Sequence, residues 1–292
     1  MKHLIIAFVI SILLSSCLSN SEQEIGYEES DYEYLFKSNN NSPKKGIFKI
    51  KSVPNYSNPQ SVVVDNENSI LYVSNQNNSG GYITRVFLNG NIIDTLPIKT
   101  LNHPQGMAVV EQKLYITDGN HIIVYNINKE STEKDINIYN SQNLKDIVSD
   151  ADNNIFVTDA SNGYIYKINK NYVEPFIKDS TFTSSNGLCN SDVNIAVAAN
   201  NSIYIINSIN GNKKRFTNLP FTPQGLKAHN DSIFIVSDNY GNIYKTTKTK
   251  CIKIINSSDS VSSSYFEYLA DQNLLFVPTY YNNTLDVYEI GI

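Results

Sequence analysis

Short apolar runs alternate with polar turn residues along most of the chain, and their length and spacing predict strands rather than helices. Six of these runs open with a similar phrase, which reads Pro-Gln-Ser or Pro-Gln-Gly at residues 59, 104 and 223. The lead residues of the six openings are Gln60, Gln105, Asp146, Asn186, Gln224 and Tyr265. They recur about every forty residues, which is the period of a β-propeller with about four strands per blade.

A second strand follows each opening and supports the same period. These runs are β-branched or aromatic, are bounded by Asn, Asp, Ser or Gly, and cover residues 70–73, 113–116, 154–157, 194–197, 232–235 and 274–277. Third strands follow in all six periods, but a fourth strand follows in only five of them. Residues 46–52, which precede the first opening, carry the alternation of the missing strand. We therefore expect an all-β, six-bladed β-propeller over residues 46–292, whose last blade is closed by this N-terminal strand.

The first residues predict the cellular location. An apolar run at residues 4–14 is too short for a transmembrane helix and has the length of a signal peptide core. Leu14-Ser15-Ser16-Cys17 follows directly and resembles the bacterial lipobox, in which the cysteine receives the lipid. The sequence thus predicts a lipoprotein signal peptide at residues 1–16 and a membrane anchor on Cys17. The propeller would then lie in the bacterial cell envelope, outside the cytoplasm.

The charge pattern separates a tether from the propeller. Residues 17–45 begin with the lipidated cysteine and are rich in Glu, Asp, Ser and Asn, which is typical of a flexible acidic linker. The whole chain has 28 acidic and 23 basic residues and a formal charge of −5. Because no basic stripe stands out in the sequence, we expect no nucleic-acid partner, and we expect a monomer.

Cysteine and histidine give little catalytic signal beyond the anchor. Cys189 lies in the first strand of the fourth period and Cys251 in the outer strand of the fifth, so the two are expected at different radii as single thiols. His103 precedes Pro104 at the mouth of the second blade, where it could face the channel, while His121 and His229 lie next to predicted turns. This arrangement does not support a Ser-His-Asp triad.

Several motifs together resemble a known family. They are the Ser-Asn-Gly-Leu at 185–188, the Thr-Asp endings at 117–118 and 158–159, and the closing segment 274–279 with Asn283 and Tyr288. This set resembles the six-bladed propellers of the gluconolactonase, senescence marker protein and luciferin-regenerating enzyme family. Propellers with NHL repeats share the Pro-x-Gly opening and the Thr-Asp ending and are the second choice.

The resemblance implies a particular site, which this chain matches only in part. Family enzymes hold one divalent cation in the central channel through a Glu opening the first blade, an Asn opening the fourth and an Asp opening the fifth, while an Asn opening the third contacts substrate. These places fall on Gln60, Asn186, Gln224 and Asp146. Only Asn186 is retained, and neutral amides replace both carboxylate ligands, which weakens cation binding. We therefore expect no cofactor, and a Ca²⁺, Zn²⁺ or Mn²⁺ site would have to rest on Asn186 and Asp146.

The functional prediction is a binding or accessory propeller rather than an enzyme. One mouth of the channel would be ringed by five polar side chains, those of Gln60, Gln105, Asp146, Asn186 and Gln224. Such a ring suits a neutral, hydroxyl-rich small molecule such as a sugar. A scaffold that recruits an envelope protein along the disc face or rim is a further class that fits the tether equally well. Tyr240, Tyr280 and Tyr281 in predicted turns or loops offer stacking faces.

Two alternatives stay open. The amides can simply satisfy backbone groups at strand starts. The chain can also be a divalent-metal-dependent lactonase or related hydrolase, in which Asp146 is the catalytic general base.

Overall fold

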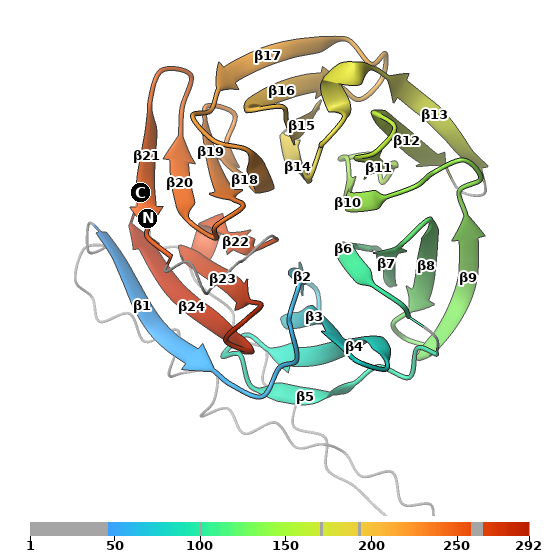
Figure 1. The fold of residues 1–292 in the computed structure, drawn as a ribbon. Helices are drawn as coiled ribbons and strands as arrows, with labels where there is room; N and C mark the ends of the chain where they lie inside the picture. Colours follow the sequence, from blue (N-terminus) through green and yellow to red (C-terminus); the bar gives the residue numbers. More distant parts are fainter. Residues whose placement is uncertain (1–45, 100, 170–171, 192–193, 258–264, 292) are drawn as a thin grey trace, which may run out of the picture. The chain divides into compact units, whose positions relative to one another are not determined.

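The computed structural model describes residues 46–99, 101–169, 172–191, 194–257 and 265–291. In this part of the chain six four-stranded antiparallel sheets surround a central axis, which confirms the predicted six-bladed propeller (Figure 1). From the axis outward, blades 1 to 3 are β2(Ser61–Asp65), β3(Ile70–Asn77), β4(Gly80–Phe87), β5(Ile92–Thr95); β6(Pro104–Val110), β7(Lys113–Asp118), β8(His121–Asn126), β9(Ser131–Asn137); and β10(Leu144–Ser149), β11(Ile155–Asp159), β12(Tyr164–Asn169), β13(Tyr172–Lys178). Blades 4 to 6 are β14(Gly187–Ser191), β15(Asn194–Ala199), β16(Ser202–Asn207), β17(Lys213–Asn218); β18(Pro223–Asn230), β19(Ile233–Asp238), β20(Ile243–Thr246), β21(Cys251–Ile255); and β22(Glu267–Leu269), β23(Leu274–Thr279), β24(Thr284–Gly291), β1(Gly46–Val53).

The N-terminal strand closes the ring as predicted. In Figure 1 the blue β1 lies along the red β24, and the two strands pair antiparallel from Gly46 with Gly291 to Val53 with Leu285. Ser52 donates a hydrogen bond to Asp286 at 2.5 Å, and Lys49 forms an ion pair with the same carboxylate. Because β1 covers the edge of β24, the sixth blade gains the same four strands as the others.

The hydrophobic core is divided into six parts, each lying between two successive blades. Phe156, for example, is fully buried on β11 of blade 3 and packs with Leu188 and Ile195 of blade 4. Side chains of each blade thus fill the space against the next blade. Truncating one such aromatic side chain to Ala costs about 3–5 kcal/mol in buried cores.

Every outer strand carries one β-bulge. The register shifts once in each pairing of third and fourth strands, so one extra residue interrupts each outer strand. From blade 1 to blade 6 the extra residues are Ile93, Glu133, Phe176, Phe216, Ile254 and Ile50. A bulge increases the local twist, which suits a blade whose outer edge is strongly rotated relative to its inner edge.

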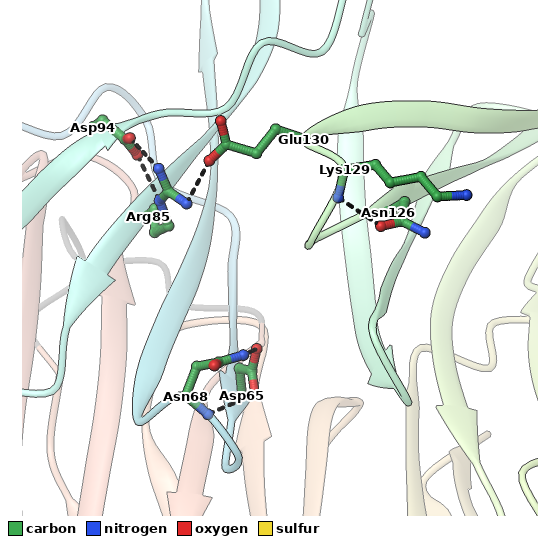
Figure 2. Close-up of polar contacts among 7 residues, drawn as sticks. All are labelled: Asp65, Asn68, Arg85, Asp94, Asn126, Lys129 and Glu130. Atoms are coloured by element: carbon green, nitrogen blue, oxygen red, sulfur yellow. Dashed lines mark hydrogen bonds and ion pairs between the residues drawn. The ribbon is translucent and has the colours of Figure 1, made fainter. Parts of the chain in front are cut away.

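Polar contacts tie blades together at the rim and order the turns (Figure 2). Arg85 on β4 binds Asp94 of its own blade, with 2.9 Å between Nε and Oδ1, and Glu130 of blade 2, with 3.0 Å between Nη1 and Oε1. In the turn after β2, the Asp65 carboxylate accepts the backbone and side-chain N–H groups of Asn68. Such local hydrogen bonds satisfy backbone groups in the turn, where the hydrogen bonds between strands end.

The predicted signal peptide, Cys17 and the acidic linker lie outside the described residues. No helix in the ranges that the structure describes is long and apolar enough to cross a membrane. Cys189 and Cys251 are both free thiols, in the first strand of blade 4 and the outer strand of blade 5. The expected single thiols are confirmed for these two positions.

Candidate functional site

The start of each inner strand forms one mouth of the channel, and a bulge sets which side chains reach it. In blade 3, Leu144 pairs with Asp159 but Ile147 pairs with Val157, so one extra residue lies between them. Blades 2 and 5 have the same shift at the same place.

This register corrects the sequence alignment at one position. Leu144 corresponds to Pro104 and Ile147 to Met107, since each pair has the same partners on the second strand. Lys145, rather than Asp146, therefore lies level with Gln105. Asp146 occupies the next position along the strand, where blade 2 has Gly106.

The hydroxyl residues near the ends of the second strands hold the bulges. Thr158 Oγ1 accepts the N–H of Asp146 at 3.2 Å, and Ser237 Oγ accepts the N–H of Gly225 at 2.8 Å. Thr117 Oγ1 donates across blades to the backbone oxygen of Lys145 at 2.8 Å. The repeated Thr or Ser of the sequence motif thus satisfies backbone groups that the bulge leaves unpaired.

The carboxylates that follow these hydroxyls have a structural role. Asp159 accepts the N–H groups of Gln142 at 3.1 Å and Asn143 at 3.2 Å, in the loop that leads into the same blade. Asp118 receives equivalent bonds from residues 102 and 103. Both side chains are buried, so each carboxylate fixes a loop at the channel mouth.

Two glycines allow the inner strands to approach closely. A Cβ atom at Gly106 would lie 2.5 Å from the backbone oxygen of Lys145 and 2.8 Å from Oδ1 of Asp146. At Gly187 it would lie 2.7 Å from the backbone oxygen of Gln224. The Gly of the repeated motif is therefore required by the neighbouring blade rather than by a ligand.

The four amide residues of the predicted ring lie at the starts of the inner strands of blades 1, 2, 4 and 5, and they differ in what they contact. Gln60, Gln105 and Gln224 are partly exposed, whereas Asn186 is buried and donates to the backbone oxygen of Pro223 at 3.2 Å. Gln60 lies 3.4 Å from Gln76, between Nε2 and Oε1. Within the described ranges the side-chain amides of Gln105 and Gln224 have no hydrogen-bond partner. These two amides keep their donors and acceptors available at the mouth.

Asp146 lies below this ring and is almost fully buried. Its Oδ1 accepts the N–H of Ile147 at 2.9 Å, and its Oδ2 accepts the N–H of Leu188 in blade 4 at 2.7 Å. Burial raises the pKa of Asp146 to about 7, although the charge of Lys227 and these two hydrogen bonds oppose the rise. The carboxyl group therefore titrates near neutral pH.

Lys227 and Glu267 complete a charged group of three in the channel. Lys227 Nζ donates to Glu267 Oε2 at 2.9 Å, and Glu267 Oε1 accepts the N–H of Tyr268 at 3.0 Å. Burial lowers the pKa of Lys227, but Glu267 and Asp146 together outweigh burial and leave this pKa raised. A protonated Lys227 thus pairs with Glu267 of blade 6 and is also stabilised by the charge of Asp146 of blade 3.

The channel is nearly filled at this depth. The hollow bounded by Asp146, Lys227 and Tyr265 measures about 10 Å³, which is about the space of one water molecule. Tyr265 is buried, and burial together with the charge of Asp146 raises the pKa of its hydroxyl. A sugar-sized ligand does not fit here, so any such ligand must lie over the mouth.

The residues around Asp146 do not fit a divalent cation site. Both carboxylate oxygens already accept backbone N–H groups, and the neighbouring ammonium group of Lys227 repels a cation. Asn186 has its own backbone partner in blade 5. Among the described residues, no three His, Cys, Asp or Glu side chains are grouped so that they could hold a metal ion.

Lys145 and His103 are titratable groups at the mouth, and of these two Lys145 was missed from sequence. Lys145 is partly buried, and burial lowers the pKa of its ammonium group. Burial and the charge of Lys145 lower the pKa of His103 on the loop before β6. Aligning the buried neighbours Leu144 and Ile147 with Pro104 and Met107 would have identified Lys145 as the ring member.

The predicted stacking residues lie on the same side as the mouth, because their turns join second to third strands. Tyr240 keeps 58% and Tyr281 62% of their full exposure, in blades 5 and 6. Tyr280 packs edge-on against Tyr281, with ring centroids 4.9 Å apart. Asn58 Nδ2 lies 3.4 Å from the backbone oxygen of Tyr280, which links this turn to the loop before blade 1.

Solved structures with the same architecture include two lyases. One is a catalytically inactive histidine-to-alanine variant of virginiamycin B lyase from Staphylococcus aureus with quinupristin, at 14% identity and a TM-score of 0.60, covering 84% of this chain and 100% of that chain. The other is a streptogramin B lyase, at 12% identity and a TM-score of 0.60, covering 86% of this chain and 100% of that chain. The likeness establishes a shared six-bladed propeller fold. A comparison with models of protein families found no match, and neither did one with curated protein sequences. The gluconolactonase-like assignment therefore stays a prediction.

Proposed function

We propose that this protein is a ligand-binding propeller that takes a neutral, hydroxyl-rich molecule at the mouth of its channel. The observation that supports this most is the pair of partly exposed amides of Gln105 and Gln224, which lack partners within the described residues. An amide offers two donors and an acceptor, which is what vicinal hydroxyl groups require. The exposed Tyr281 and Tyr240 add apolar faces on the same side.

The geometry below the mouth favours binding over catalysis. The positive charge of Lys227 offsets the negative charge of Asp146 and Glu267. The hollow beside Asp146 admits about one water molecule. A reacting bond of a large ligand has no room to approach Asp146. Lys145 adds one cation at the channel mouth, so a carboxylate on the ligand would strengthen binding without being required.

An enzyme that uses Asp146 is the second candidate. A carboxyl group with a pKa of about 7 has the value expected of a general base near neutral pH. The likeness in fold to lyases is compatible with this candidate, but it carries no residue roles at 14% identity. For this candidate to hold, the mouth would have to open far enough for substrate to reach the carboxylate.

The cellular setting belongs to the same proposal. The lipobox-like Leu14-Ser15-Ser16-Cys17 supports a lipid anchor, and residues 17–45 would act as a tether that places the propeller in the cell envelope. A Cys17→Ala variant should then move from the membrane to the soluble fraction. Retention in the membrane fraction would contradict the anchor.

The binding test uses the purified protein and a panel of neutral mono- and oligosaccharides, measured by calorimetric titration. Gln105→Leu combined with Gln224→Leu should weaken binding at least tenfold, because the ligand would lose both amide partners. Gln272→Leu is the matched control, since Gln272 is an exposed amide in a turn at the opposite end of blade 6. Equal loss in the control, or no loss in the double variant, would contradict binding at the mouth.

The same titrations separate the two candidates. Each saccharide that binds is incubated with the protein, and its products are analysed by mass spectrometry. Lactones, the substrates of the enzyme alternative, are incubated and analysed in the same way. Binding without turnover supports the binding propeller. Turnover that is lost in Asp146→Asn would favour the enzyme instead.

A further inference from the structure

A second hollow lies on the outer edge of the propeller, at the fourth strands of two blades. It is formed by residues 214–218 of β17 in blade 4 and by residues 248–251 at the turn into β21 of blade 5. β17 and β21 are the outermost strands of adjacent blades (Figure 1). We call this hollow the rim groove, and its lining also includes Asn194, Ile205, Asn207, Asn212 and Asp231. It consists of two adjoining cavities of about 420 and 310 Å³, which share Arg215, Phe216 and Lys248.

The rim groove is cationic although the whole chain is acidic. Lys214, Arg215, Lys248 and Lys250 line it, and Asp231 is the one acidic residue among the described lining residues. Within the described ranges none of these four cations has an ion-pair partner. Four unpaired cations around one hollow repel each other and are stabilised when an anion binds.

An aromatic side chain lies between the two cavities. Phe216 is the extra residue of the bulge in β17, so the bulge determines how this ring is presented. Its ring packs edge-on against Phe234 with centroids 5.0 Å apart, and Lys248 Nζ lies 5.9 Å from the centroid of the Phe216 ring. The ring is thus held from below and has a cation beside its face.

Neutral hydrogen-bonding groups complete the lining. Thr217 and Thr249 supply hydroxyl groups in the larger cavity, and Asn194, Asn207 and Asn212 supply amides in the smaller one. Thr217 Oγ1 donates to the backbone oxygen of Lys248 at 3.1 Å, which fixes the turn against β17. This bond links the two blades that form the groove.

We propose that the rim groove binds an anionic oligosaccharide, with carboxylate or sulfate groups on the cations and a sugar ring against Phe216. A free inorganic anion would use the cations alone and leave the aromatic ring and the amides without a role. A neutral sugar would leave four cations unpaired. An anionic saccharide is the ligand class that engages all three kinds of group. This site is separate from the mouth and does not depend on the function proposed there.

The test is calorimetric titration of the purified protein with tetragalacturonate, a sulfated chondroitin hexasaccharide, maltotetraose and sodium sulfate. At least one of the two anionic saccharides should bind, and several-fold more weakly at 300 mM than at 50 mM NaCl, because salt screens the contact. Arg215→Gln combined with Lys248→Gln should weaken that binding at least tenfold. Lys129→Gln, an exposed lysine of blade 2, is the matched control and should change nothing.

Three results would overturn the proposal: binding of neither anionic saccharide, equal affinity for maltotetraose or sulfate, or unchanged affinity in the double variant. The substituted side chains are exposed, and an unchanged melting temperature would show that folding is intact. Gln105→Leu with Gln224→Leu should leave this binding unaffected. That result would show that ligand binding at the rim groove does not depend on the amides at the mouth.

Discussion

At the scale of residues, Asp146 has the most unusual environment in the channel. Its carboxyl group is buried, accepts two backbone N–H groups and lies near both Lys227 and Glu267. Burial raises its pKa from 3.8 to about 7, so the folded protein holds a proton on Asp146 at pH values where the unfolded chain has released it. Stability from this group is therefore present below about pH 4 and is lost as the pH rises toward 7.

Replacement of Asp146 by Asn tests this sign. Asn cannot ionise, so the wild type should lose stability relative to Asp146→Asn as the pH rises from 4 to 8. The relative change should be about 2–4 kcal/mol, since each pKa unit corresponds to about 1.4 kcal/mol. Chemical denaturation at several pH values measures it. Asp152→Asn, an exposed acid of the same blade, should show no such trend, and a flat difference for Asp146→Asn would contradict the raised pKa.

Sequence predicted most of the mouth but not its chemistry. The position of Gln60, Gln105, Asn186 and Gln224 at strand starts follows from the repeated motif alone. Lys145 was missed because blade 3 reads Leu-Lys-Asp-Ile where blades 2 and 5 have the Pro-Gln-Gly phrase, so the motif gave no fixed point for aligning this blade. The pairing of Lys227 with Glu267 was missed because the two residues come from different blades.

At the scale of elements, the Thr-Asp ending of a second strand is a device for fixing a loop and a bulge. The hydroxyl binds the bulged backbone of the inner strand, while the carboxylate binds the incoming loop. In the sequence, the Thr-Asp endings were part of the resemblance to gluconolactonase-like propellers. The contacts in the structure explain why the fold needs these two residue types. The same pair of residue types can therefore recur in propellers of different function.

Asp159→Ala tests the loop-fixing role. The change leaves the N–H groups of Gln142, Asn143 and Ser161 without their acceptor, so the protein should lose about 2–4 kcal/mol of stability. Thermal and urea unfolding measure the loss. Asp152→Ala should cost less than about 0.5 kcal/mol, because that side chain is exposed. Equal losses would contradict the assignment.

At the scale of the whole propeller, sequence reasoning was most successful. The number of blades and the closing strand followed from counting periods, because each blade repeats the same need to bury two faces against its neighbours. The rim groove could not be found this way. Its cations lie on two different blades, and a charge count over the acidic chain conceals them.

Deletion of residues 46–53 tests the importance of closure. The sixth blade would lose its outer strand and the contacts of Ser52 and Lys49 with Asp286, so we expect a strongly lowered melting temperature or aggregation. Deletion of residues 18–45 should leave the melting temperature nearly unchanged. Similar behaviour of the two deletions would contradict the closure argument. Differential scanning calorimetry measures both.

The pairing of β1 with β24 also sets an order of events during synthesis. The hydrogen bond between Ser52 and Asp286 joins residues that are 234 positions apart, so β1 leaves the ribosome long before its partner exists. Successive blades can pack against one another as they emerge, but the ring can close only after the last strand has been made. A chain that stops early therefore keeps β1 unpaired and exposes an open blade edge. Only a full-length chain can therefore close the ring, and a truncated chain with an open blade edge is a target for cellular proteases.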